Sequence, residues 1–379
     1  MINKICVLSA YYPSEKDPHY AFVGTLINAI AGMGIECHVI SPVSSIEKKH
    51  RAVSRTEITK NGAKVFVHCP RFIGFPSKNK IRLTYKWNIQ SMRRAIKRAF
   101  DSEVGSCDAI YSHFIYSGIN AAWLSGKTGI PAYVAIGESG IQDTKLCRAL
   151  FGEDLLNHIR GVVAVSSALK KEARDLGLFS SETPIEVFPN SADADTFRPL
   201  DQNACRKKLG IGENDFVVSF VGGFIKRKGL DKLQEAVSRH PDWKCILIGA
   251  GDLPVTLSKE QIAFSGRVPH DRIPEYICAS DVFVLPTLAE GCCNAIVEAM
   301  GCGLPVVSSD RPFNDDILDE SNSIKVNPES VDEIERAIVR MEQDPALRKR
   351  LAAGALQKGQ ALSIVNRAAN IVDYMEKNL

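Results

Sequence analysis

DVFVLPTLAEGCCNAIVEAMGCGLPVVSS, residues 281–309, carries the clearest structural signal in the chain. The apolar run at Val282–Leu285 has the length and composition of a buried β-strand, and a proline follows it. After a polar loop, apolar residues recur at helical spacing from Asn294 to about Met300, and we place Asn294 as the N-cap. A second apolar run begins at Val306. This order of strand, helix and strand predicts a parallel sheet covered by helices.

The same alternation extends along the whole chain of 379 residues. Further strand-like runs lie at 5–8, 37–40, 65–68, 109–111, 132–135 and 162–165 in the first half, and at 216–221, 245–248, 263–265 and 324–326 in the second. A chain of this length is too long for one ordinary core and suits two α/β domains. We therefore expect an α/β protein with two parallel sheets.

A change of composition separates the two sets of strands. In EVFPNSADADTFRPLD, residues 186–201, Pro, Asn and Asp accumulate and the periodicity stops, which is typical of a linker. We predict a first domain at 1–195, a second domain at 196–355, and a C-terminal helix at 356–379 that packs back, with the first domain as its expected partner.

The composition is that of an ordinary globular protein, with 45% hydrophobic and 24% charged residues. A net charge of +3 is too small to indicate a nucleic-acid partner. The 11 cysteines form no C-x-x-C pair, and no segment approaches the roughly 20 apolar residues of a bilayer span. The first residues, MINKICVLSAYYPS, have the pattern of a strand rather than of a signal peptide. We expect a cytoplasmic protein with reduced thiols.

Two common nucleotide-binding motifs are missing. No G-x-G-x-x-G follows the first strand, and GAGDLP at 249–254 lacks the third glycine. No Walker loop is present either. A dinucleotide oxidoreductase and a P-loop ATPase are both disfavoured.

VSFVGGFIKRKGLDKL, residues 218–233, offers another phosphate site. A strand runs into Gly222 and Gly223, and a loop with Lys226, Arg227 and Lys228 then leads to a helix. Glycines permit close backbone approach, and a cation near a helix start suits a diphosphate. An ordinary tight turn with solvated lysines fits this segment equally well.

Two carboxylates flank the helix start in the opening stretch. Glu298 lies four residues beyond Asn294 on the same helix face, and Glu290 lies in the preceding loop. Together they could accept hydrogen bonds from sugar hydroxyls while free backbone N–H groups between them hold phosphate oxygens. The alternative is a solvated loop residue and a helix-surface residue, although the apolar context of AIVEAM favours the first interpretation.

FSGRVPHDRIPEYICASDVFVLPTLAEGCCNAIVEAMGCGLPVVSSD, residues 264–310, closely resembles the nucleotide-sugar site of the retaining glycosyltransferases of family four, the glycosyl transferases of group 1. The resemblance rests on E-G-x-x-N-x-x-x-E-A followed by G-x-P-V-V, and VGGFIKRKGL, VFPNSADADTFRP and the N-terminal stretch from Tyr11 extend it over essentially the whole chain. It implies the GT-B fold, in which two Rossmann-like domains face each other across a cleft. The first domain would bind the acceptor and the second the nucleotide-sugar.

The resemblance also implies roles for single residues. Glu298 would bind the ribose hydroxyls, Glu290 the hydroxyls of the transferred sugar, and Lys228 the diphosphate. The remaining donor-binding positions would be Gly222 and Gly223 in the phosphate loop, Arg267 and Val268 against the nucleobase, and Gly291, Cys292, Cys293 and Asn294 at the helix start.

The implied reaction is retaining transfer from a UDP- or GDP-linked sugar to a glycan or lipid-linked acceptor in polysaccharide biosynthesis, with no metal and no cofactor. The D-x-D at 193–195 lies in the linker, so we interpret it as a turn rather than a metal site.

Two departures from the family pattern bear on catalysis. Many relatives have Arg where this chain has Gly223, and Arg227 or Lys226 could replace that charge. Many also have His-Gly where this chain has Gly137–Glu138, which makes Glu138 a third candidate catalytic residue beside Glu290 and Lys228, with a general-base or a structural role.

Three other features allow both a functional and a structural interpretation. His113 follows a strand and could face the site or be a satisfied core histidine. The pair Cys292–Cys293 suggests redox or metal chemistry, but small residues that permit close approach fit better. Eight Lys or Arg and no acid lie between Lys78 and Arg98, so residues 72–98 could contact an anionic membrane or form a solvated helix.

The sequence is also compatible with rival functions inside and outside the enzymes. A nucleotide-sugar epimerase or a phosphorylase on a similar fold would share the donor motif. A non-catalytic nucleotide-sugar-binding partner in a polysaccharide assembly complex is the alternative outside the enzymes.

Overall fold

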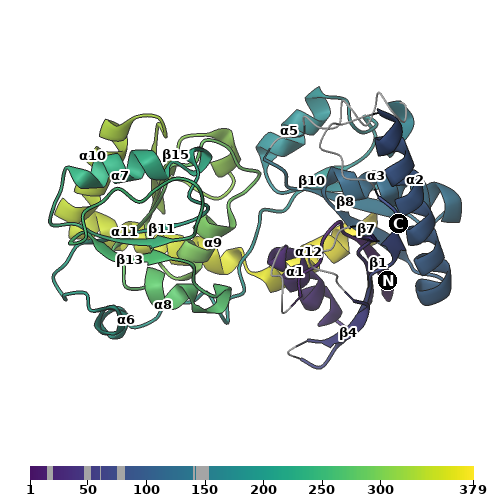
Figure 1. Cartoon of the computed structure of the whole chain (residues 1–379), viewed down its shortest axis with the longest axis horizontal. Helices are drawn as coiled ribbons and strands as arrows, with labels where there is room; N and C mark the ends of the chain where they lie inside the picture. The colour runs from purple at the N-terminus through teal and green to yellow at the C-terminus, as the bar shows by residue number, and fades with distance from the viewer. Residues whose placement is uncertain (15–19, 47–52, 60, 75–81, 140, 142–152) are drawn as a thin grey trace. The chain divides into compact units, whose positions relative to one another are not determined.

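The structure is a computed structural model that describes residues 1–14, 20–46, 53–59, 61–74, 82–139, 141 and 153–379. It divides into two compact units, each with its own parallel sheet (Figure 1). Unit 1 comprises Met1–Phe188 and Arg367–Leu379, and unit 2 comprises Pro189–Asn366. The predicted α/β fold with two parallel sheets is confirmed.

Unit 1 is built on an eight-stranded sheet in the order β10-β9-β8-β7-β1-β2-β5-β4. All neighbours are parallel except β4, which runs antiparallel to β5. The strands are β1 (Lys4–Leu8), β2 (Glu36–Ile40), β4 (Arg55–Ile58), β5 (Lys64–His68), β7 (Ala109–His113), β8 (Ala132–Ile136), β9 (Ile159–Ala164) and β10 (Ile185–Val187), while β3 (Val43–Ser44) pairs with β6 (Arg71–Phe72). The central strands β7 and β8 are buried along their whole length, as apolar runs covered on both faces should be.

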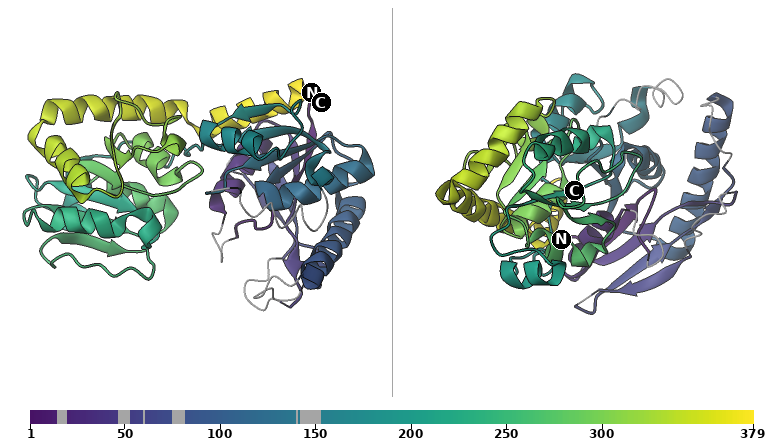
Figure 2. Two further views of the ribbon diagram at one scale, coloured as in Figure 1. Left: turned by 90° about the horizontal axis from the view of Figure 1, so that it is seen from above. Right: turned by 60° about the vertical axis from the view of Figure 1, so that its left-hand side comes forward.

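The α-helices in the described residues of unit 1 are α1 (Ala21–Ala31), α2 (Arg82–Ala99), α3 (Phe114–Thr128), α5 (Ser167–Asp175) and α12 (Ile364–Lys377), of which Arg367 onward belongs to this unit. Tyr374 of α12 donates its hydroxyl to the carbonyl of Pro184 at 2.7 Å and accepts from the backbone N–H of Val162 at 2.9 Å. Glu376 accepts from the N–H of Ile2 at 2.6 Å, so the two chain ends lie side by side (Figure 2). The last helix is therefore an integral part of unit 1.

Unit 2 contains a six-stranded, fully parallel sheet in the order β13-β12-β11-β14-β15-β16. Its strands are β11 (Val217–Val221), β12 (Lys244–Ile248), β13 (Ile262–Gly266), β14 (Val282–Leu285), β15 (Val306–Ser309) and β16 (Ser323–Val326). Its helices are α6 (Gln202–Leu209), α7 (Leu230–Ser238), α8 (Ile273–Ile277), α9 (Asn294–Gly301), α10 (Val331–Gln343) and α11 (Pro345–Ala361). Helix α7 packs beside α10, and α9 packs beside α11 (Figure 1).

The unit boundaries differ from the sequence expectation. The first boundary falls after Phe188 instead of after residue 195, because Ala192 forms a bridge with Ser363 and thereby joins unit 2. The second falls after Asn366 instead of after residue 355, because Gly359 of α11 lies directly against the backbone of Gly301 in α9. Both segments follow their hydrogen bonds and packing rather than their composition.

Asp193 of the D-x-D forms a turn in this segment. Its carboxylate accepts from the N–H of Asp195 at 3.1 Å and from the hydroxyl of Thr196 at 2.9 Å.

None of the helices in the described ranges is long and apolar enough to cross a membrane.

Candidate functional site

The order of strands in unit 2 identifies where a ligand should bind. From β11 the chain proceeds outward through β12 and β13, and it then returns to β14 beside β11 and proceeds outward through β15 and β16. The topology therefore switches between β11 and β14, and open α/β sheets bind ligands beyond the carboxyl ends of the strands at such a point. The two segments that the sequence singled out, after β11 and after β14, lie at this place.

Glycines bring the loops of this edge into close contact. The N–H of Gly222 donates to the carbonyl of Ile248 at 2.9 Å, and the N–H of Gly249 donates to that of Gly266 at 2.9 Å. A Cβ on Gly249 would clash with the carbonyl of Gly222, and one on Gly251 would clash with the carbonyl of Phe224. The glycines of GAGDLP therefore serve loop packing, which explains two glycines without a complete dinucleotide motif.

Gly229 controls the distance between the β11 loop and the β14 loop. It has a φ of 74°, and a Cβ there would clash with the carbonyl of Pro286. Only glycine combines this backbone conformation with such a close approach. The contact places Lys228, the residue before it, against the loop that carries Glu290.

Glu290 is the centre of a charged cluster. Its side chain is only 10% exposed, and its Oε1 accepts from Lys228 Nζ, from Arg227 Nη1 at 3.2 Å and from the Thr287 hydroxyl at 3.0 Å. Arg227 also donates to the carbonyl of Ala289, and its own carbonyl accepts from the backbone N–H of Leu288 at 2.8 Å. Two cations from one loop thus converge on one carboxylate from the other.

The start of α9 differs by one residue from the sequence expectation. Asn294 is the first helical residue, and Cys293, with φ −84° and ψ 112°, is the N-cap. No side-chain hydrogen bond caps the helix, and the side-chain oxygen of Asn294 has no hydrogen-bond partner in the described part of the chain. The first N–H groups of α9 thus keep donor capacity for an anion.

The two adjacent cysteines are buried, and burial raises the pKa of Cys293 to about 11. Its thiol is therefore protonated near neutral pH, which argues against a nucleophilic or redox role. The carbonyl of Cys292 accepts from the side-chain amide of Asn190 at 2.9 Å, so this loop is anchored to the start of unit 2. Gly291 precedes them and is buried.

Glu298 lies on α9 with 11% of its side chain exposed, and its Oε1 lies 2.9 Å from His270 Nε2. The hydrogen bond to Glu298 raises the pKa of His270 above its ordinary value. His270 follows β13, two residues beyond Val268, and was not singled out from the sequence. The relevant signal was the polar pair after V-P in FSGRVPHDR, at the same sheet edge as the other loops.

The remaining predicted donor residues occupy the same edge. Gly222 and Gly223 follow β11, and Arg267 and Val268 follow β13, with Arg267 exposed and Val268 half-buried. An ideal Cβ on Gly223 has no neighbouring atom closer than 3.9 Å, so a Cβ at this position would meet no steric barrier.

Glu138 and His113 belong to unit 1. Glu138 accepts from the N–H of Ile115 at 2.6 Å and from that of Gly137 at 2.9 Å, so its carboxylate holds the start of α3. Burial raises the pKa of Glu138 above its ordinary value. His113 is buried at the end of β7, and burial lowers its pKa to about 3, so its ring is neutral.

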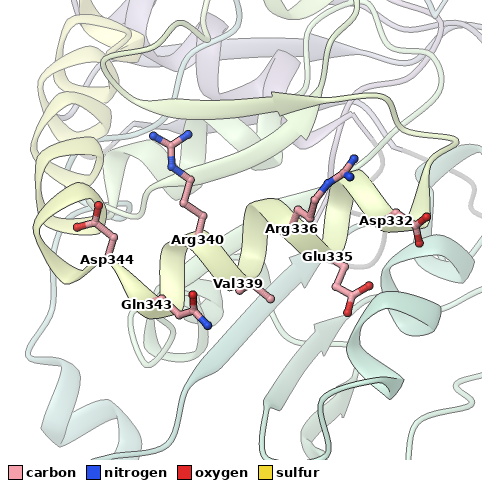
Figure 3. A pocket seen from close by; sticks show the side chains of 7 residues that line it. All are labelled: Asp332, Glu335, Arg336, Val339, Arg340, Gln343 and Asp344. Carbon is pink, nitrogen blue, oxygen red and sulfur yellow. The ribbon is translucent and has the colours of Figure 1, made fainter.

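A hollow of about 430 Å³ lies along α10, lined by Asp332, Glu335, Arg336, Val339, Arg340, Gln343 and Asp344 (Figure 3). Asp332 and Glu335 form ion pairs with Arg239 at the end of α7, at 2.8 and 2.5 Å. These ion pairs indicate that Asp332 and Glu335 connect α10 to the end of α7. In the described residues no group of three or more His, Cys, Asp or Glu side chains is arranged to hold a metal ion.

Two family models match the chain. The model for Glycosyltransferase Family 4 matches residues 21–196, and the model for Glycosyl transferases group 1 matches residues 201–358. TuaC of Bacillus subtilis (strain 168), named as a glycosyltransferase of teichuronic acid biosynthesis, is 26% identical over 94% of both chains. The UDP-Gal:alpha-D-GlcNAc-diphosphoundecaprenol alpha-1,3-galactosyltransferase of Escherichia coli is 29% identical over 53% of this chain and 54% of its own.

Solved structures share the fold over nearly the whole chain. Sucrose-phosphate synthase from Thermosynechococcus elongatus aligns with a TM-score of 0.80 and 18% identity, over 99% of this chain and 98% of that one. HepE of Anabaena in complex with UDP aligns with a TM-score of 0.74 and 19% identity, over 99% and 100% of the two chains. Because the two family matches together span most of the sequence, this chain belongs to the family-4 glycosyltransferases of the GT-B fold, enzymes that take a sugar from a nucleotide-sugar donor.

Proposed function

We propose that the protein is a retaining, metal-independent glycosyltransferase that moves a sugar from a UDP- or GDP-linked donor to a glycan or lipid-linked acceptor. One observation carries this proposal. Lys228 and Arg227 converge on Glu290 at the switch point of unit 2, beside the uncapped start of α9 that leads to Glu298. The cations and free N–H groups suit a diphosphate, and the two carboxylates suit the hydroxyls of the ribose and of the transferred sugar.

The two cations support metal-independent loss of the diphosphate. As the bond between the anomeric carbon and the diphosphate oxygen breaks, negative charge develops on that oxygen, and preorganised donors stabilise it most effectively. Lys228 supplies a point charge, and the start of α9 supplies backbone donors. Arg227 lies close enough to Glu290, at 3.2 Å, to supply the charge that Gly223 lacks.

The environment of Glu138 supports retention. A transferase that inverts configuration needs a base to take the proton of the acceptor hydroxyl. Glu138 already accepts two backbone N–H bonds, which fits a role in holding α3. In the retaining reaction the acceptor oxygen bonds to the anomeric carbon on the face that the diphosphate leaves, and the departing diphosphate takes the acceptor proton.

Glu290 has a second task in this scheme. In the free protein its Oε1 forms an ion pair with Lys228. The donor's diphosphate would compete with Glu290 for this positive charge. The carboxylate then becomes available to accept hydrogen bonds from the transferred sugar. Donor binding and alignment of the sugar would thus be coupled through one ion pair.

The names of the relatives support the donor and acceptor classes. The E. coli enzyme is named for a UDP-sugar donor and an undecaprenyl-diphosphate acceptor, TuaC is named for teichuronic acid synthesis, and HepE was solved with UDP. We extend from these to a lipid-linked glycan acceptor used in polysaccharide biosynthesis.

Part of the predicted membrane-contact run supports that acceptor. On α2 the side chains of Lys86, Trp87, Arg94 and Arg98 are exposed, and the exposed Ile73 has its N–H bonded to Ser91 of this helix at 3.1 Å. Residues 75–81 of the run 72–98 lie outside the described residues. A basic helix with a tryptophan suits the surface of an anionic bilayer. Co-sedimentation with phosphatidylglycerol vesicles, lost in Arg94→Glu with Arg98→Glu, would test it.

The first test is calorimetric titration of UDP, GDP and ADP in EDTA, with wild type, Glu298→Gln and Glu335→Gln. Glu335 is a matched control because it lies 2.8 Å from a histidine nitrogen, that of His240, just as Glu298 does at 2.9 Å, but on α10. A hydrogen bond to a charged group contributes about 1.5–3 kcal/mol, which predicts a loss of about tenfold or more in Glu298→Gln alone.

The outcomes separate the rival functions. No binding of any nucleotide, or equal loss in both variants, would contradict the donor site. Conversion of the nucleotide-sugar to its epimer without acceptor would identify an epimerase, and binding without turnover on any acceptor would identify a non-catalytic partner.

A further inference from the structure

A pair of cysteines lies at the edge of the unit 2 sheet that is opposite to the edge with Glu290 and Glu298, which we call the donor edge. Cys278 is the C-cap of α8 and precedes β14, and Cys302 is the C-cap of α9 and precedes β15. Because β14 and β15 are parallel neighbours, the segments that lead into them lie side by side. The sheet therefore brings together two cysteines that are distant in the sequence.

Both cysteines line one hollow of about 340 Å³. Its wall also contains Ser280 and, from α11, Arg348 and Lys349. The hydroxyl of Ser280 is buried and has no hydrogen-bond partner in the described part of the chain, so it can bond to a small polar molecule in the hollow. The hollow thus gives a small, uncharged reagent a route to the two sulfur atoms.

The thiols of Cys278 and Cys302 form a hydrogen bond with each other. This bond lowers the pKa of Cys278 below its ordinary value, although burial opposes the effect, and the backbone N–H of Leu200 acts in the same direction as the bond. The same bond raises the pKa of Cys302. Cys278 is therefore the thiol that ionises more readily, and Cys302 is the neighbour that stabilises its thiolate. A nucleophilic thiolate beside a second thiol is the arrangement of redox-sensitive cysteine pairs.

Access distinguishes this pair from cysteines inside the sheet. Cys278 and Cys302 are each 6% exposed, whereas Cys245 in β12 has no exposed surface and burial raises its pKa to about 12. Oxidation of a thiol needs both thiolate character and contact with the oxidant. Cys245 lacks both properties, and Cys278 has both.

The backbone around the pair is held in place. Arg206 of α6 is buried, and its Nε donates to the carbonyl of Ala279 at 3.0 Å while its Nη2 lies 2.8 Å from a carboxylate oxygen of Asp281. These contacts fix the segment that follows Cys278. The N–H of Cys302 donates to the carbonyl of Glu298 at 3.1 Å, which continues α9 to this cysteine. The two thiols are thus presented to each other by well-anchored chain segments.

We propose that Cys278 and Cys302 form a reversible disulfide when hydrogen peroxide enters the hollow, and that this disulfide links α8 to α9. The thiolate of Cys278 attacks one peroxide oxygen, which breaks the O–O bond, forms a sulfenic acid and releases hydroxide. The thiol of Cys302 then attacks the sulfenic sulfur, and water leaves as the S–S bond forms. Two thiols together lose two electrons and two protons, and one peroxide becomes two molecules of water.

The disulfide is expected to act on the donor edge through α9. Glu298 bonds to the N–H of Cys302 through its carbonyl and to His270, which precedes α8, through its side chain. The two sulfur atoms of a disulfide are only about 2.05 Å apart, so the ends of α8 and α9 must approach when the bond forms. Because α9 has only 8 residues, a shift at its end also moves Glu298. This effect on the donor rests on the proposed function, whereas formation of the disulfide does not.

The test is disulfide mapping of the reduced protein after treatment with hydrogen peroxide. Free thiols are blocked with N-ethylmaleimide, and a protease that cuts after glutamate places Cys278 in residues 276–290, Cys302 in 299–320 and Cys205 in 187–213. The samples are wild type, Cys302→Ser and Cys205→Ser. Cys205 is a matched control because its thiol interacts electrostatically with those of Cys278 and Cys302 but does not line the hollow. Thermal unfolding of every sample shows that the variants are folded.

We expect peroxide to join peptides 276–290 and 299–320 in wild type and in Cys205→Ser, and dithiothreitol to separate them. In Cys302→Ser the sulfenic acid on Cys278 loses its partner thiol, so dimedone should capture it. The inference is wrong if these two peptides are never joined, if peptide 187–213 replaces either of them, or if dimedone labels Cys245 as much as Cys278.

Titration of UDP into the reduced and the oxidised protein tests the effect on the donor edge. Coupling between two sites typically changes an affinity by about fivefold or more, so we expect oxidised wild type to bind UDP about fivefold more weakly. Peroxide-treated Cys302→Ser should bind UDP as the reduced protein does. Equal affinity of reduced and oxidised wild type would overturn the coupling. If the disulfide forms but the reduced protein binds no nucleotide, the proposed function fails and the disulfide stands.

Discussion

Lys228→Met keeps the aliphatic stem of the side chain and removes the charge that pairs with Glu290. The two side chains are 16% and 10% exposed. Removing one partner of a buried pair costs about 3–5 kcal/mol, but Arg227 and Thr287 remain on the same carboxylate oxygen at 3.2 and 3.0 Å. We therefore expect the lower cost of one charged hydrogen bond, about 2 kcal/mol.

The free energy of unfolding is measured by urea titration with Trp243 fluorescence, in a background where Trp87 and Trp123 are Phe. Trp243 is buried in unit 2, so it reports on the unit that contains the pair. About 2 kcal/mol corresponds to a fall of about 4–8 °C in the melting temperature of a unit of this size. Lys232→Met, on the first turns of α7, is the control with an unchanged melting temperature.

Glu290→Gln and the double variant complete a thermodynamic cycle. If the ion pair exists in solution, the coupling energy should exceed about 1 kcal/mol. A coupling energy below about 0.5 kcal/mol would refute the reasoning, because Lys228 would then point elsewhere in the free protein. Saturating UDP should also stabilise wild type more than Lys228→Met, because stabilisation by a ligand follows its affinity.

Three further predictions test other contacts. Gly229→Ala combines a left-handed backbone with a clash against the loop after β14, so it should cost about 2–5 kcal/mol in thermal unfolding, whereas Gly62→Ala, with the same strain and open space, should cost about 1. The hydrogen bond to Glu298 raises the pKa of His270, so the stabilisation that this bond gives the folded state is complete below about pH 6.5 and is lost as pH rises through the raised pKa. The difference in the free energy of unfolding between wild type and His270→Ala, under about 1 kcal/mol, should therefore disappear toward pH 8. Tyr374→Phe removes a hydroxyl that bonds two backbone groups, so unit 1 should lose about 1–3 kcal/mol in urea unfolding.

Local patterns predicted the strands well because apolar, β-branched runs in a parallel sheet are buried on both faces. β14 begins and ends at the predicted residues, and the buried strands of both units overlap the predicted runs. The short edge strands β4 and β10 escaped because an edge strand is only partly buried and has no continuous apolar run. The N-cap of α9 was misplaced by one residue because backbone angles, rather than the preference of Asn, select the cap.

Contacts between distant loops could not be read from the sequence. Glu290 meets Lys228 only because β11 and β14 are neighbours in the sheet, and Glu298 meets His270 only because the loop after β13 extends to α9. Glu138 shows the same point in the other unit. Glu138 was left with a general-base or a structural role, and the contact of its carboxylate with the N–H of Ile115, at the start of α3 after a different strand, could not be read from the sequence.

In the proposed donor site, the cluster of Arg227, Lys228 and Glu290 would supply the positive charge that an arginine at position 223 gives to many relatives. Arg227 and Lys228 bring two positive charges to the single carboxylate of Glu290, so this cluster keeps a net positive charge before any ligand binds. A diphosphate would therefore be attracted to this cluster without an additional cation. Because Gly223 has no side chain, the backbone at this position could approach the diphosphate closely. Each loop also fixes the other through Thr287 and Ala289, so the cations are oriented before the donor arrives. Such preorganisation is what makes a charged group effective at a developing negative charge.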